Sequence, residues 1–308
     1  MRLTVRCYAK VNLGLAVYAP RADGYHEIAT ILQTISLADL LTCTPAGDTW
    51  SMTIEPANIL PAGETNLVLR AARALEGRLG AGATARPRAH FHLCKRVPHG
   101  AGLGGGSSDA AATLRLLARL WRLPRSAATR ALLHEVAASL GSDVPFFLAG
   151  GTALATGRGE ILRSLPAVRG VHFVVVAPPF GISTPEAYSG VDWDLTPPKL
   201  IHTFAHTLEE YEGQLLDALR SVPRGLYNSF ESTLFAKYPL LSAITRQLED
   251  AGAQATALSG SGSAVFAVAA SAAAARHLEN TCTAAGLRAF RTVPVTCGSR
   301  LMVEEWSN

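Results

Sequence analysis

The sequence PHGAGLGGGSSD, residues 98–109, is the stretch that decides the fold. It follows an alternating segment, residues 89–94, that predicts a strand, and it leads into an Ala/Leu-rich segment that predicts a helix from about Ser107 to Trp121. Five of the seven residues 100–106 are glycine, so the backbone can adopt positive φ angles and approach a ligand closely. The start of the helix adds unpaired N–H groups and a positive dipole end. We therefore expect a phosphate-binding loop, with hydroxyls on Ser107 and Ser108 for phosphate oxygens or Mg²⁺.

The loop is neither of the two common nucleotide motifs. No GK[ST] follows it, as a Walker A motif requires, and its glycines do not fit GxGxxG. A flexible linker or a tight turn is the alternative, although linkers rarely lead directly into a strong helix. A second cluster, LSGSGS at residues 258–263, precedes a predicted strand and by itself fits a hairpin or a bulge equally well. Together the clusters predict two glycine-rich segments that meet at one pocket.

Lys10 and Asn12 alternate with the apolar residues Val11 and Leu13 in a predicted strand, residues 3–18. Residues 10 and 12 share one face of a strand, opposite residues 11 and 13. This pattern predicts the polar wall of a pocket, and an ordinary half-exposed strand is the alternative.

Asp143 lies in GSDVPFF, residues 141–147, after a helix that we predict from an N-cap at Ser126 to Leu140. Pro145 fits the first turn of the next helix. Asp143 is therefore either a simple N-cap or an ionised carboxylate near a helix N-terminus that can accept a hydroxyl proton. A phosphate loop together with such a base is typical of phosphoryl transfer to an alcohol.

These motifs resemble those of the GHMP kinase superfamily. The matching segments are AKVNLGL at residues 9–15, PHGAGLGGGSSDAA at 98–111 and LSGSGSAVFA at 258–267. RADGYH at 21–26 and GSDVPFF narrow the resemblance to members that act on 4-diphosphocytidyl-2-C-methyl-D-erythritol. The resemblance implies an α+β fold with a ribosomal protein S5 domain 2-like N-terminal domain (residues 1–160), a ferredoxin-like C-terminal domain (161–308) and an active site in the cleft between them.

The resemblance also implies roles for individual residues. Asp143 would be the catalytic base, and Lys10 its partner beside the accepting hydroxyl. The substrate would contact Asn12, Tyr25, His26, Thr184 and Tyr188, with the aromatic rings on the cytosine. The ATP site would comprise Asn66, Leu67, Lys95, Pro98, Gly100, Ala101, Gly102, Leu103, Gly104, Gly105, Gly106, Ser107 and Ser108, and the C-terminal glycine motif Gly260, Ser261 and Gly262.

The implied reaction transfers the γ-phosphoryl group of MgATP to the 2-hydroxyl of that substrate. Mg²⁺ would arrive with the nucleotide, and we expect no metal held by the protein, since His26 has no partner at ligand spacing. The alternatives are another GHMP small-molecule kinase, such as homoserine or mevalonate kinase, a non-catalytic nucleotide-binding module, and an RNA-binding protein on the related ribosomal-type fold.

Composition limits the class of protein. The chain has 308 residues, 48% hydrophobic and 17% charged, enough for two domains with real cores. A net charge of +4 without a Lys/Arg block argues against nucleic-acid partners. Five scattered cysteines without CxxC argue against disulfides or a zinc site and for a reducing compartment. With no signal-peptide pattern and no long apolar run, we expect a cytoplasmic monomer or homodimer without membrane contact.

Lysine is rare in the chain. Only four of the 28 basic residues are lysines, and Lys10 and Lys95 fall in the implied site, whereas Lys199 and Lys237 lie in predicted helices as surface charges. The other predicted strands are 27–43 (one or two strands), 171–177, 263–269, 290–295 and 300–305. The other predicted helices are 67–79, capped by Asn66 and ended by Gly80, and 199–220, 228–250 and 271–286.

Overall fold

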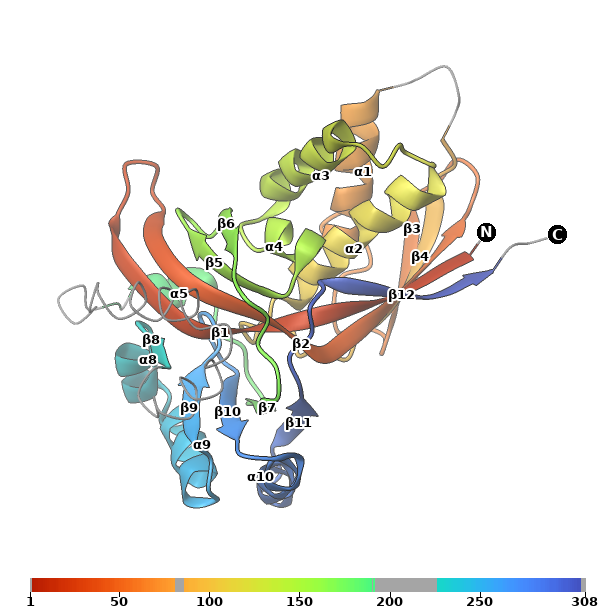
Figure 1. Ribbon diagram of the computed structural model, residues 1–308. Coiled ribbons are helices and arrows are strands. Elements are labelled where there is room, and N and C mark those ends of the chain that lie inside the picture. The colour runs from red at the N-terminus through yellow and green to blue at the C-terminus, as the bar shows by residue number, and fades with distance from the viewer. Residues whose placement is uncertain (1, 81–85, 190, 192–225, 306–308) are drawn as a thin grey trace.

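A computed structural model describes residues 2–80, 86–189, 191 and 226–305. Two sheets organise these residues (Figure 1). The first sheet has eight strands among the described residues, and five of them lie in the order β12-β1-β2-β4-β3. Outside this path, β8 pairs with β1, β5 pairs with β2, and β6 pairs with β5. Its strands are β1 (Arg2–Pro20), β2 (His26–Pro45), β3 (Ser51–Glu55), β4 (Ala89–Cys94), β5 (Thr152–Thr156), β6 (Ile161–Ser164), β8 (Tyr227–Asn228) and β12 (Ser299–Glu305).

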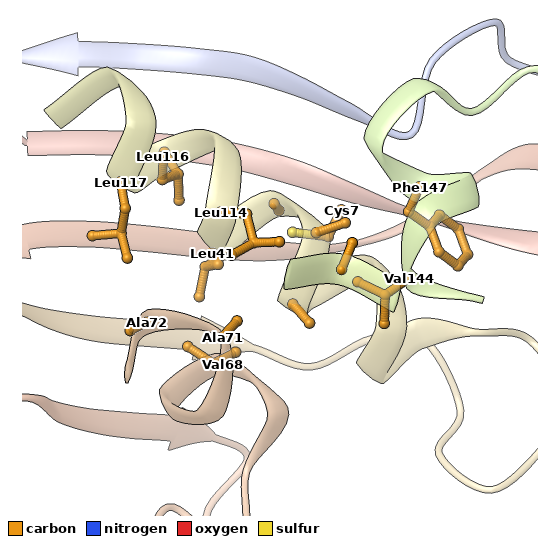
Figure 2. Packing of buried hydrophobic residues seen from close by; sticks show 14 of the residues in the cluster. Cys7, Leu41, Val68, Ala71, Ala72, Leu114, Leu116, Leu117, Val144 and Phe147 are labelled. Carbon is orange, nitrogen blue, oxygen red and sulfur yellow. The ribbon is translucent and has the colours of Figure 1, made fainter. Parts of the chain in front are cut away.

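Four helices cover one face of the first sheet (Figure 1): α1 (Leu67–Leu79), α2 (Gly105–Leu120), α3 (Ala127–Leu140) and α4 (Val144–Ala149). Their apolar sides form a core with the sheet, in which Leu41 of β2 packs with Val68 of α1 and Leu114 of α2 (Figure 2). The caps follow the sequence prediction, because the side chains of Asn66 and Ser126 accept hydrogen bonds from the first turns of α1 and α3.

The second sheet has the order β11-β7-β10-β9, and all of its pairs are antiparallel. Its strands are β7 (His172–Ala177), β9 (Ala255–Leu258), β10 (Val265–Ala269) and β11 (Arg288–Thr292), and α9 (Pro239–Asp250) and α10 (Ala272–Ala284) pack on it. If the four strands are numbered by their order along the chain, they lie side by side in the order 4-1-3-2, and α9 and α10 lie in the two crossover connections. That is the ferredoxin-like topology which the family resemblance implied.

The long strand β1 contributes to both cores. Its residues Leu3 and Cys7 pack under the helices, whereas Val11 and Leu13 pack against the second sheet beside Phe173. The opposite face of the same stretch of β1 is left for Lys10 and Asn12. One strand thus positions polar side chains at the junction of the two sheets.

The division into residues 1–160 and 161–308 stays a prediction. The hairpin of β5 and β6 crosses that boundary within the first sheet, and β12 returns to pair with β1. The chain therefore contributes to the first sheet from both sides of the predicted boundary.

Some sequence predictions of elements are corrected. The single helix at 228–250 is wrong: α8 (Glu231–Lys237) ends before Tyr238, and α9 starts at Pro239, whose fixed φ and missing N–H suit a first turn. Residues 26–45 form one strand, and the strands β3, β5, β6, β8 and β9 were not predicted. The predicted helix 199–220, with Lys199, lies outside the described residues. No described helix has the length and apolar character needed to cross a membrane.

Candidate active site

A cavity of about 570 Å³ lies where β1, the glycine loop, the start of α4 and the segment 260–262 come together. A smaller cavity of about 220 Å³ lies on the other side of the loop, and both are lined by Gly100, Gly102, Gly104 and Ser107. The larger volume is typical of a small-molecule site. The glycine loop therefore separates two adjoining compartments.

The two glycine-rich segments contact each other directly. Ser259 Oγ donates to the carbonyl of Gly102 at 3.0 Å, and the N–H of Ala264 donates to the carbonyl of Ala101 at 3.1 Å. A Cβ on Gly102 would lie 1.9 Å from the carbonyl oxygen of Ser259. The sequence prediction that both segments meet at one pocket is confirmed, and glycine at 102 is required by this close approach.

The start of α2 is open to a ligand. Gly104, at φ 68°, precedes the helix, and no side chain caps it, whereas Ser271 caps α10 as Asn66 caps α1. The first N–H groups of α2 therefore point toward the loop without a capping partner, which suits an anion. Ser107 lines both cavities, while Ser108 is fully buried with an Oγ that has no hydrogen-bond partner among the described residues. Ser107 is the better placed hydroxyl.

Lys10 and Asn12 form the buried wall of the larger cavity. Lys10 is 3% exposed, and its Nζ donates to Asn12 Oδ1, while Asn12 Nδ2 donates to Thr30 Oγ1 at 2.7 Å. A half-exposed strand is therefore the wrong interpretation of this segment. Burial lowers the pKa of Lys10, and the negative charge of Asp143 acts in the opposite direction. The ammonium and the carboxylate thus interact across the cavity that both line.

Asp143 precedes the first residue of α4, but its side chain makes no capping hydrogen bond. It lines the larger cavity together with Lys10. Asp143 therefore occupies the N-cap position of α4, but its side chain does not act as a cap. Asp143 is thus a carboxylate at a helix N-terminus that lines the cavity and makes no cap hydrogen bond, which suits a proton acceptor.

Aromatic side chains also line the larger cavity. The rings of His26 and Tyr188, from β2 and α5 (Thr184–Ser189), stack at 4.8 Å between centroids. Tyr25 is 52% exposed, and the guanidinium of Arg158 lies 4.5 Å from the centre of its ring. Thr184 Oγ1 lies 3.4 Å from Ser261 Oγ, which connects α5 to the second glycine segment. The predicted substrate residues are thus gathered at one cavity.

Lys95 supports the glycine loop from within the protein. Its buried Nζ lies 2.5 Å from Asp39 Oδ2 and 2.9 Å from Asp109 Oδ2. Burial acts to lower the pKa of Lys95, but the two carboxylates outweigh it and raise that pKa. A Cβ on Gly105 would lie 2.8 Å from this Nζ, so the ammonium lies directly behind the start of α2. Lys95 lines the smaller cavity, but its charge is engaged by the two carboxylates.

The remaining predicted residues of the nucleotide side line the smaller cavity. They are Leu67, Pro98, Ala101, Leu103, Gly105 and Gly106. Asn66 is buried and caps α1 through a hydrogen bond from the N–H of Val68, and its Nδ2 donates to the carbonyl of Pro61. Both side-chain ends of Asn66 therefore have protein partners, and it positions Leu67 at the cavity.

Comparison with known proteins agrees with this geometry. Residues 66–151 match the N-terminal domain of GHMP kinases, and residues 213–286 match their C-terminal domain. A 4-diphosphocytidyl-2-C-methyl-D-erythritol kinase from Solibacter usitatus is 42% identical over 268 residues, which are 85% of this chain and 79% of that protein. The chain belongs to this family of GHMP kinases. It is accordingly an ATP-dependent kinase that acts on a small molecule.

Solved structures agree with the assignment. The crystal structure of a 4-(cytidine 5'-diphospho)-2C-methyl-D-erythritol kinase matches with a TM-score of 0.77 and 34% identity, covering 94% of this chain and 98% of that one. The homoserine kinase from Cytophaga hutchinsonii matches with a TM-score of 0.72 over 98% and 97% of the two chains. Its identity is 17%, so this second likeness shows the shared GHMP fold alone.

Sequence reasoning missed two residues that build this GHMP kinase site. Asn228 Nδ2 donates to the carbonyls of Leu258 and Gly260, each at 2.8 Å, and so holds the second glycine segment. Arg158 lines the cavity beside Tyr25, although its segment, GRGE, suggested only an interruption between domains. A lone buried-strand asparagine carries no local signal, whereas an arginine between two glycines in a turn was a signal that could have been followed.

Proposed function

We propose that this kinase transfers the γ-phosphoryl group of ATP to the 2-hydroxyl of 4-diphosphocytidyl-2-C-methyl-D-erythritol, in the non-mevalonate route to isoprenoid precursors. The observation that carries the proposal is that buried Lys10 and Asp143 line one cavity, which is bounded by both glycine segments. The family of the chain supports the choice of substrate.

In this proposal Asp143 accepts the proton of the attacking hydroxyl. Its side chain is not used to cap α4, and it lines the same cavity as the buried Lys10. Lys10 also offers positive charge to the transferring phosphoryl oxygens, where negative charge is spread in the transition state. Asn12 fixes the ammonium by accepting its hydrogen bond.

The glycine loop and the uncapped start of α2 are suited to the triphosphate, because backbone N–H groups and a helix dipole favour anions. Ser107 would bind a phosphate oxygen or Mg²⁺, which arrives with the nucleotide. The smaller cavity, with Leu60 and Leu67 in its wall, would take the adenine. Thr184 and Ser261 would then lie on the acceptor side.

The aromatic side chains that line the larger cavity are suited to the cytosine. Tyr25 and Tyr188 provide ring faces, and base stacking on such faces contributes about 1–3 kcal/mol per base. The ring of His26 is held against Tyr188, so its nitrogen-bearing edge is oriented for hydrogen bonding. We also propose a cytoplasmic location, on the cysteine usage, and a monomeric or homodimeric state.

A product assay tests the proposal. The purified chain with MgATP is given the cytidylyl substrate, homoserine or mevalonate in parallel, and ADP and the phosphorylated product are quantified. We expect turnover of the cytidylyl substrate to be at least about a hundredfold above that of homoserine or mevalonate. Those two molecules lack the base that the aromatic side chains of the cavity would recognise. Comparable turnover of homoserine or mevalonate would overturn the choice of substrate but not the kinase chemistry.

A further inference from the structure

Three side chains with metal-binding atoms gather on the first sheet, away from both cavities. Strands β3 and β4 pair in parallel, and their register places Thr53 beside His92 and Glu55 beside Cys94. Phe91 and Leu93 of β4 are buried in the core under the helices. Because side chains alternate along a strand, His92 and Cys94 face the opposite, open side of the sheet.

The ligand atoms of the three side chains form a compact triangle. Cys94 Sγ lies 3.3 Å from Glu55 Oε2 and 3.5 Å from His92 Nε2, and Nε2 lies 3.6 Å from Oε2. Typical bond lengths from zinc to sulfur, nitrogen and oxygen, taken with tetrahedral angles, give ligand-to-ligand separations of about 3.3–3.6 Å. The triangle therefore already has the size of one face of a tetrahedral zinc site.

His92 is also held in the orientation that a metal ligand needs. Its Nδ1 is hydrogen-bonded to Thr53 Oγ1 at 2.9 Å, and that hydroxyl lies 3.1 Å from His90 Nε2. His90 Nδ1 in turn contacts Ser51 Oγ at 2.9 Å. A ligating histidine usually binds a polar partner through its other ring nitrogen, which fixes the tautomer and directs the free nitrogen at the metal. Thr53 provides that partner.

Charge and access also suit a divalent cation. A thiolate and a carboxylate together balance the charge of Zn²⁺, and a thiolate with an imidazole is a donor set that zinc prefers. The side chains of Glu55 and His92 are 70% and 41% exposed, so an ion and a water molecule can reach them.

We propose that Glu55, His92 and Cys94 bind one Zn²⁺, with a water molecule as the fourth ligand. None of the three lines either cavity, so the site is separate from phosphoryl transfer. β3 lies at the edge of the sheet among the described strands, and the ion would fasten its end to β4. The backbone already joins the strands there, since the N–H of Lys95 donates to the carbonyl of Glu55 at 2.7 Å. Sequence spacing hides the site because its ligands are drawn from two strands.

Calorimetric titration of the metal-free, reduced full-length chain with Zn²⁺ tests the proposal. We expect one ion per wild-type chain and at least tenfold weaker binding in Cys94→Ala and in His92→Ala. Thr53→Val should weaken binding about 10–100-fold by releasing the histidine. Cys297→Ala, which removes another partly buried cysteine, is the control and should bind as the wild type does. Co²⁺ should give a thiolate-to-metal absorption band that Cys94→Ala lacks.

Thermal unfolding separates loss of the site from loss of the fold. Without metal, Cys94→Ala should melt close to the wild type, and Zn²⁺ should raise the melting temperature of the wild type only, because the ion binds the folded state. Kinase activity of the folded variant should be unchanged. Equal zinc uptake by the wild type and Cys94→Ala, or no uptake by either, would overturn the proposal.

Discussion

At the scale of single residues, Lys10 shows how burial and pairing act together. Removing an ammonium from water lowers its pKa, and a carboxylate beside it opposes that shift. The strand around it alternates, so the residue types at 9–13 already predicted a polar face opposite an apolar one. That Asp143 is the facing carboxylate was only implied by the family resemblance, because nothing local links the two positions.

Asp143→Ala should lower kcat by about 10²–10⁴-fold, since the variant has no group to accept the hydroxyl proton. Nucleotide affinity should change little, because the loop and the start of α2 are untouched. Steady-state kinetics and a nucleotide-binding titration check this. Turnover near that of the wild type would remove Asp143 from the mechanism.

Lys10→Arg should also lower kcat, by about a hundredfold, because a guanidinium cannot occupy the same space. A Cβ placed on Gly260 would lie 2.9 Å from Lys10 Nζ, so the ammonium lies close against the second glycine segment, and a larger planar group would have to sit elsewhere. Lys237→Arg is the matched control, because that lysine is exposed and pairs with Glu186 on the surface. Near-normal turnover of Lys10→Arg would show that the choice of lysine is incidental.

At the scale of elements, the caps and the glycine loop were predictable from the sequence. Pro239 also signals the split between α8 and α9, because proline suits the first turn of a helix. The apolar positions of 228–250 continue at helical spacing across the proline, which favoured one helix. A tertiary contact holds the start of α8: Glu231 in its first turn accepts a hydrogen bond at 2.7 Å from the N–H of Leu258, at the end of β9.

Burial raises the pKa of Glu231 to about 7, against the backbone hydrogen bond that lowers it. Because the folded pKa exceeds the unfolded one, this group favours folding fully below pH about 4.5, and that contribution is lost as pH rises through about 7. Glu231→Gln keeps the acceptor without the charge. It should be more stable than the wild type by about 1–2 kcal/mol at pH 8 and nearly equal to it at pH 5.

Urea unfolding of both proteins from pH 5 to pH 8 measures this difference. The free energy of unfolding of the wild type should fall with pH relative to that of Glu231→Gln. Parallel pH profiles for the two proteins would contradict the assignment of a raised pKa to this side chain.

At the scale of the whole molecule, Gly298 and β12 join the C-terminal half of the chain to β1 and to the end of α4. The carbonyl of Gly298 accepts from the N–H of Tyr8, its N–H donates to the carbonyl of Ala149, and β12 then pairs with β1. The last strand of the chain thus covers one edge of β1, the strand that carries Lys10. Residues 300–305 were predicted as a strand, but not as part of the first sheet.

Gly298→Ala should destabilise the protein by about 1–3 kcal/mol. Its Cβ would lie 1.9 Å from the carbonyl oxygen of Phe147 and would push the backbone at residue 298 away from α4. Gly63→Ala is the control: a Cβ there meets nothing within 4 Å, and stability should change by less than about 0.5 kcal/mol. Chemical denaturation measures both. Equal stability of Gly298→Ala and the wild type would show that the backbone around residue 298 relaxes freely.

The sequence by itself determined the local structure: the alternating strands, the capped helices α1 and α3, and the two glycine segments. These depend on neighbouring residues, through side-chain period, capping and glycine φ angles. Only the tertiary structure decided which distant groups meet. Three sets of contacts depend on strand register and packing in this way. They are the ion pairs of Lys95 with Asp39 and Asp109, the hydrogen bond from Asn228 to Gly260, and the triangle of Glu55, His92 and Cys94. No spacing along the chain encodes those contacts, because they form between segments that approach only when the sheets and helices pack.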